Sequence, residues 1–258
     1  MHEIAMAQME LDQELYDLQQ EAREIQVSAF EDDFEQRQAK LDTQRSLLDR
    51  SNMKLLENDF VGQENYIEGQ MDIVETTRIN LQEKQTELEN LYKNGIITDR
   101  DYNDRMMELV DEVTSNEQEF WDLQIQFKDN ILAKWDYVRQ ETVADIDDIT
   151  REIEADYIDL KDTDHERKRE KQNRELELLN KKKQEIIDSN AELDRLWQDE
   201  VLKGLMSEEE WLERKRTLAD EGLSIEQEIY AKQEELRQSW IDEWKKDIQD
   251  RDNLIADQ

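Results

Sequence analysis

The residues Asn94–Asp101, with the sequence NGIITDRD, carry the main turn signal of the chain. Gly95 can take the left-handed conformation that ends a helix, and Ile96 can fold back onto the last turn. Thr98, followed three residues later by Asp101, is typical of a helix N-cap with an acidic first turn. The stretch therefore predicts a helix, a turn of about three residues and a second helix, and so short a turn makes the two helices antiparallel neighbours.

On both sides of this turn, apolar residues recur at seven-residue steps, which is typical of coiled-coil seams. An isolated amphipathic helix on a globular body would explain one such block, but the blocks cover most of the chain. They are Phe34, Leu41, Leu48 and Leu55; Ile67, Val74, Leu81 and Leu88; Met106, Val113, Phe120 and Phe127; and Ile146, Ile153 and Leu160.

If the chain reverses at Gly95, residues that face each other have numbers that add to a constant. The pairs nearest the turn, such as Val74 with Phe120, add to 194. Both sides then skip 19 residues, after which the same constant returns in the pairs Leu48/Ile146, Leu41/Ile153, Phe34/Leu160, Leu18/Leu176 and Leu15/Leu179. This shared skip predicts one hairpin that runs almost to the N-terminus, loosened or bent near Gly62 and Gly69.

The turn recurs 109 residues later, where Gly204–Trp211 (GLMSEEEW) matches Gly95–Tyr102 (GIITDRDY). Gly204 and Leu205 take the places of Gly95 and Ile96, and Ser207 with Glu210 makes a capping box. The repeat predicts a third arm that returns along the second. Chance convergence of two well-capped turns is the competing interpretation.

The predicted fold is therefore all-α: a long antiparallel coiled-coil hairpin with a third helical arm, forming an elongated rod. The expected boundaries are a first arm over 1–94, a turn at 95–97, a second arm over 98–203 with a polar stretch at 161–175, a turn at 204–206 and a third arm over 207–258.

Trp240 and Trp244 are the candidate partner contacts. Facing pairs whose numbers add to about 411 place them beside Lys171 and Arg167. There the ring faces and the basic stems could cover the polar stretch in a cation–π arrangement. The two tryptophans could equally form an exposed patch for another chain.

The composition excludes several classes of protein. The 258 residues include no Pro, which indicates selection against helix breakers and argues against a loop-rich enzyme. A net charge of −35 disfavours direct nucleic-acid binding. No apolar run is long enough for a membrane span and no signal region is present, so we expect a protein that is cytoplasmic at synthesis.

We expect no catalytic, cofactor or metal site and no small-molecule substrate. His2 and His165 have no second ligand at metal spacing, and the chain has no Cys. The sequence also lacks a phosphate-binding Gly loop and a nucleophile elbow.

The segments Leu91–Tyr102 and Leu202–Trp211 resemble the helical hairpins of the bacterial short C-terminal (SHOCT) domain family. The whole chain, which is acidic and has broken heptads with scattered Trp and Tyr, resembles coiled-coil regions of tape measure and related minor tail proteins of tailed phages. That resemblance implies a structural role in tail assembly and incorporation in the virion tail.

The expected function is that of a non-enzymatic structural protein that scaffolds protein partners or associates with itself through its helical seams. The alternative is an acidic regulatory module that occupies the basic, nucleic-acid-binding surface of a partner protein. The module predicts salt-sensitive binding, whereas the scaffold predicts little salt dependence.

Overall fold

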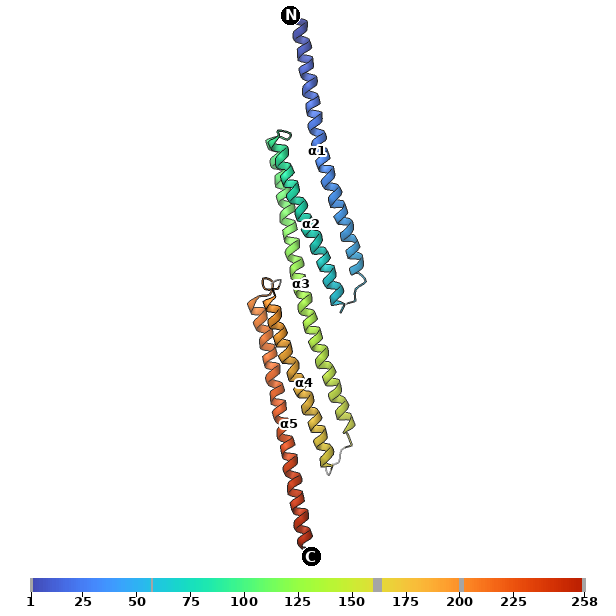
Figure 1. Ribbon diagram of the computed structural model, residues 1–258, viewed down its shortest axis with the longest axis vertical. Coiled ribbons are helices and arrows are strands. Elements are labelled where there is room, and N and C mark those ends of the chain that lie inside the picture. Colours follow the sequence, from blue (N-terminus) through green and yellow to red (C-terminus); the bar gives the residue numbers. More distant parts are fainter. Residues whose placement is uncertain (1, 57, 160–163, 200–201, 257–258) are drawn as a thin grey trace. The chain divides into compact units, whose positions relative to one another are not determined.

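The computed structural model describes residues 2–56, 58–159, 164–199 and 202–256, and these residues form helices and turns without a strand. The fold is therefore all-α, which confirms the predicted fold class (Figure 1). The helices are α1 (His2–Asn52), α2 (Phe60–Lys93), α3 (Asp99–Asp156), α4 (His165–Gln198) and α5 (Glu208–Ala256).

The chain divides into two units, residues 1–131 and 132–258. Unit 1 consists of α1, α2 and the first part of α3. Unit 2 consists of the second part of α3, α4 and α5. The helix α3 is thus continuous across the boundary and belongs to both units.

The first arm predicted over 1–94 is wrong, because it consists of two helices with a reversal between them. Short polar side chains next to the break supply local hydrogen bonds that compete with the helix. The Ser51 hydroxyl donates to the Leu48 carbonyl at 2.7 Å, and the Asp59 carboxylate caps α2 by accepting from the Gly62 backbone N–H at 2.9 Å. In place of the bend expected near Gly62, α1 ends at Asn52 and a new helix begins at Phe60.

The reversal lets α1 bury its apolar seam on α2. Leu41 is buried and lines a groove together with Ile73 and Leu81 of α2. Leu48 packs so close to Gly69 that a Cβ there would lie 3.0 Å from the leucine methyl groups. Seam burial of this kind is the main stabilising term for long amphipathic helices.

The outer pairs of the predicted hairpin are also wrong. Leu41 packs on α2 as described, whereas Ile153 belongs to a cluster in unit 2 with Ile146, Tyr157 and Leu178. Leu15 and Leu18, which the hairpin pairs with α4 residues, are 57% and 62% exposed. The remaining outer pair includes Leu160, which lies outside the described residues.

Within unit 1, the first part of α3 returns along α2. Lys84 pairs with Glu112 at 2.8 Å, and the Asn116 amide donates to the Val74 carbonyl at 3.1 Å. Val74 and Leu123 belong to one buried cluster, and Phe120 packs against it. The inner pair Val74/Phe120 of the constant-sum rule thus lies in a single cluster.

Unit 2 has the same order of elements. The second arm predicted over 98–203 is wrong in the same way as the first, because α3 ends at Asp156 and α4 starts after the N-cap Asp164, whose carboxylate accepts from the Arg167 N–H at 3.3 Å. The described part of the polar stretch, 164–175, forms this cap and the first turns of α4. The helix α5 follows α4, with Leu193 and Leu218 in one buried cluster.

The two units are copies of one three-helix repeat. The helices α2 and α4 each have 34 residues, and their N-caps, Asp59 and Asp164, are 105 residues apart. The same offset relates the buried pairs Leu41/Ile146, Gln70/Glu175, Ile73/Leu178, Leu81/Ile186 and Leu88/Leu193. After the turns the offset is 109, in the buried pairs Ile97/Met206 and Leu109/Leu218. The helix α3 is therefore the third helix of the first copy and the first helix of the second.

Candidate interaction surfaces

The first turn ends α2 through a Schellman motif. Gly95 has φ +67°, which is the left-handed conformation. Its N–H donates to the Tyr92 carbonyl at 2.9 Å, and the Ile96 N–H donates to the Leu91 carbonyl at 2.9 Å. Because the turn has only five residues between the helices, α2 and α3 are forced to be neighbours.

Thr98 and Asp101 bond reciprocally at the start of α3. The Thr98 hydroxyl accepts from the Asp101 backbone N–H at 3.2 Å and donates to the Asp101 carboxylate at 2.7 Å. The hydrogen bond from the Thr98 side chain lowers the pKa of Asp101. The cap thus favours the ionised carboxylate in the first turn, where the helix dipole also favours a negative charge.

The second turn differs from the first in how α4 ends. Ser207 caps α5 by accepting from the Glu210 N–H at 3.1 Å. However, α4 ends at Gln198, and Gly95 is the only described residue with positive φ, so Gly204 does not close a helix as Gly95 does. Instead, the Leu205 N–H donates to the carbonyl of the buried Leu202 at 2.9 Å. The longer connection, four residues more than in unit 1, provides room for this buried leucine.

Both turns carry a pair of stacked aromatic rings. Tyr92 stacks on Tyr102 with ring centroids 4.4 Å apart, and Trp197 stacks on Trp211 at 5.4 Å. The sequence comparison of the turns matches Tyr102 with Trp211 but misses the partner rings. The sequence signal for the partner rings is the offset of 105 residues, because Tyr92 and Trp197 precede the turns and are 105 residues apart.

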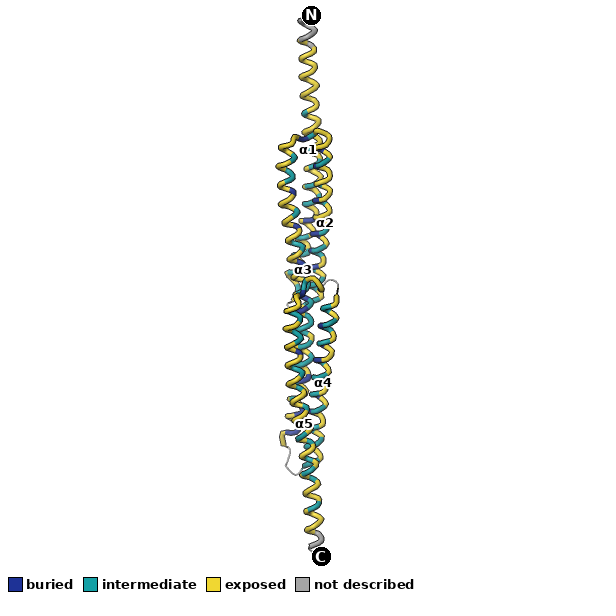
Figure 2. The backbone as a smooth tube through the Cα atoms, turned by 90° about the vertical axis from the view of Figure 1, so that its left-hand side faces the viewer, coloured by how far each residue is buried: buried dark blue, intermediate teal, exposed yellow. Residues whose placement is uncertain are grey.

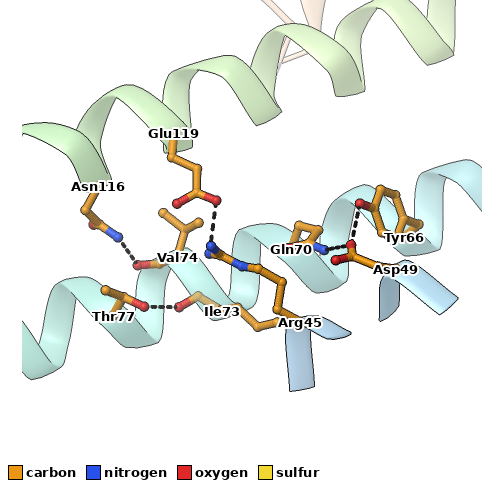
Figure 3. Close-up of polar contacts among 9 residues, drawn as sticks. All are labelled: Arg45, Asp49, Tyr66, Gln70, Ile73, Val74, Thr77, Asn116 and Glu119. Atoms are coloured by element: carbon orange, nitrogen blue, oxygen red, sulfur yellow. Dashed lines mark hydrogen bonds and ion pairs between the residues drawn. The ribbon is translucent and has the colours of Figure 1, made fainter. Parts of the chain in front are cut away.

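A polar layer joins the three helices of unit 1 (Figure 3). Asp49 of α1 accepts hydrogen bonds from the Tyr66 hydroxyl at 2.9 Å and from the Gln70 amide at 3.0 Å, both on α2. Burial, and next the hydrogen bond to Asp49, raise the pKa of Tyr66. Arg45 of α1 pairs with Glu119 of α3 at 3.0 Å. Polar contacts at seam positions specify register between helices, because any slip leaves buried polar groups without partners.

Unit 2 carries a charged pair at the corresponding position. Glu175 of α4, 105 residues after Gln70, is buried and pairs with Lys232 of α5 at 2.8 Å. Burial lowers the pKa of Lys232, but hydrogen bonds to Glu175 and Glu235 outweigh it, and the net effect raises this pKa. The polar position of the middle helix is thus retained in the repeat, with a different partner helix.

Of the two candidate partner contacts, Trp240 has a described neighbour on α4. The Arg169 guanidinium lies 4.3 Å from the Trp240 ring centroid, and Arg169 also forms an ion pair with Glu243. A cation–π contact over the polar stretch is thus present, but its cation is Arg169 and neither of the expected residues, Lys171 or Arg167. Arg167 lies over Tyr157 instead. Trp244 is 65% exposed, as the alternative prediction of an open patch requires.

The described residues form neither a metal-binding group nor a membrane-spanning helix. No group of three or more His, Asp or Glu side chains in this part of the chain is placed to hold a metal ion. No helix, as far as the structure describes it, is both long and apolar enough to cross a membrane.

No protein-family model, curated protein or solved structure matches the chain. The resemblances to tape measure proteins and to the SHOCT hairpin therefore stay predictions.

Proposed function

We propose that the protein is a non-enzymatic scaffold made of repeating three-helix units that holds protein partners. The observation that supports this proposal is the recurrence of buried positions at an offset of 105 residues. Repeats of this kind present long surfaces, because each unit contacts only its neighbours and the array grows by adding units. An elongated rod, expected from the sequence, belongs to the same proposal.

The buried polar groups support a structural role over a catalytic one. Catalysis requires polar groups that converge in a concave pocket. Gln70 and Glu175 instead bond to side chains on neighbouring helices, where they fix register. With a net charge of −35, the partners proposed for the scaffold are proteins rather than nucleic acids. The tape measure resemblance would place such a scaffold in a virion tail.

Deletion of one repeat tests the proposal. Removal of residues 41–145, which is 105 residues, joins Lys40 to Ile146. Because the deleted length equals the repeat offset, the apolar seam of the joined helix still faces α4. The matched control removes 41–143, which joins Lys40 to Ala144 and turns the seam by about 200°, since each residue turns a helix by about 100°.

The in-phase deletion should retain helical circular dichroism and one cooperative unfolding transition, whereas the control should lose cooperativity. For units arranged end to end, as the rod requires, small-angle X-ray scattering should show a maximum dimension shorter by about 50 Å, the length of a 34-residue helix. Equal loss of structure in both deletions would contradict the repeat, and an unchanged dimension would contradict the rod.

A further inference from the structure

The first turns of α1 carry an exposed apolar stripe. Its members are spaced by four, three and seven residues, which is the spacing of a coiled-coil seam. Leu11, Leu15, Leu18 and Ile25 are 64%, 57%, 62% and 61% exposed. Exposed apolar patches of this kind mark interaction sites, because leaving them in water forgoes about 25 cal/mol for each Å² that could be buried.

The segment of α1 that follows this stripe already lies in an interface. Directly after it, Val27 and Phe30 pack against the buried cluster of Leu88, Leu91 and Ile97. Figure 2 shows the same change along α1 within unit 1, from an exposed N-terminal segment to positions that are buried or half-buried. The stripe therefore has the pattern of a packed seam but, among the described residues, no helix that covers it.

The repeat indicates which kind of structure would pack on the stripe. At the offset of 105 residues, Leu15 and Leu18 correspond to Phe120 and Leu123 of α3. In unit 1 those two residues pack in the cluster with Val74 of α2, while α1 supplies the second neighbouring helix through its Arg45–Glu119 pair. The stripe thus occupies the place of a third helix in a unit, and its complement is a two-helix hairpin.

The charges beside the stripe define the partner further. Residues 6–25 contain six acidic side chains and one basic side chain, Arg23. Glu14 corresponds to Glu119, which in unit 1 pairs with Arg45 at 3.0 Å from a covering helix. A second copy of this chain would bring an equally acidic stripe, which disfavours self-pairing. The complement is therefore basic along its edges.

We propose that the stripe Leu11–Ile25 docks a partner protein that presents a helical hairpin with an apolar seam and basic flanks. The proposal deepens the scaffold function and rests on it, because it names the class of partner that a scaffold unit holds. Its failure is separable from failure of the repeat, since the in-phase deletion of 41–145 leaves the stripe in place.

The test uses the full chain and a designed hairpin probe, made of two four-heptad helices with Leu at positions a and d and Lys at e and g. Binding is measured by fluorescence anisotropy against the wild type and against L15E/L18E. The matched control L47E/L56E adds the same charge at two other exposed leucines of unit 1. Because all four leucines are exposed, circular dichroism should show that both variants stay folded.

We expect L15E/L18E to bind the probe at least tenfold more weakly than the wild type, and L47E/L56E to bind it as the wild type does. Attraction by charge alone predicts the reverse order, since the added glutamates make the chain more acidic. Equal or tighter binding by L15E/L18E, or no binding by the wild type, would overturn the proposal. A wild-type dimer in sedimentation velocity that L15E/L18E converts to monomer would also overturn it, by identifying a second copy as the occupant.

Discussion

Leu109 and Leu218 allow the repeat to be tested by energetics. Both are 2% exposed, and they occupy equivalent positions on α3 in unit 1 and on α5 in unit 2. Replacement by alanine removes three carbons, worth about 2.4 kcal/mol at about 0.8 kcal/mol for each buried CH₂. The cavity left behind adds to this cost, so the total should be about 3 kcal/mol for either substitution.

Hydrogen exchange measured by mass spectrometry can assign each loss to its unit. L109A should accelerate exchange in α2, and L218A should accelerate exchange in α4, because opening of a unit exposes its own middle helix. The matched control is L223A, at a leucine that is 56% exposed, which should cost less than about 0.5 kcal/mol. The reasoning would be refuted if L109A and L218A differed by more than about 2 kcal/mol, or if L223A were as costly as L218A.

Three other substitutions test local features of the structure. G95A should destabilise the protein by about 1–2 kcal/mol in thermal denaturation, because alanine is strained at φ +67°. G204A should be close to neutral, since Gly204 has no positive φ and nothing lies within 4 Å of an added Cβ. The raised pKa of Tyr66, caused first by burial and next by the hydrogen bond to Asp49, means that its contribution to stability is complete below pH 10.0, the unperturbed value. This contribution is lost as the pH rises through the folded-state pKa. Urea unfolding of Y66F should lack this alkaline loss, and a profile identical to that of the wild type would contradict the raised pKa of Tyr66. The lowered pKa of Asp101 means that its contribution to stability is present above pH 3.8, the unperturbed value, and is lost as the pH falls through the folded-state pKa. The D101N substitution should therefore flatten the acid limb of the plot of unfolding free energy against pH. An unchanged acid limb would count against the Thr98–Asp101 cap.

The features that could be predicted from the sequence are those encoded locally. Gly95 requires a left-handed turn, and Thr98 and Ser207 each cap the helix that follows them. The capping and turn interactions of these residues act within about four positions, so they can be predicted without knowledge of distant contacts. The all-α fold class likewise follows from the absence of Pro and from the heptads.

The breaks before α2 and α4 could not be located by the same means. Their caps are single aspartates, Asp59 and Asp164, in a chain where acidic residues are common. The heptads did not reveal them either, because the repeat of 105 residues is fifteen heptads and keeps the seam in phase. Leu41 and Ile153 therefore matched a hairpin sum although each packs on a different middle helix. The offset between the stacked rings, Tyr92 and Trp197, is the signal that would have revealed the repeat.

The three-helix unit requires that α1 doubles back on α2. Gln44 and Thr76 are exposed and line one groove between these helices. Spin labels at the two positions, measured by double electron–electron resonance, should give a short distance set by the 8–10 Å between packed helix axes and the two label arms, about 25 Å or less. One uninterrupted helix through 53–59 would instead separate the positions by 32 residues, or about 48 Å, and that result would contradict the account.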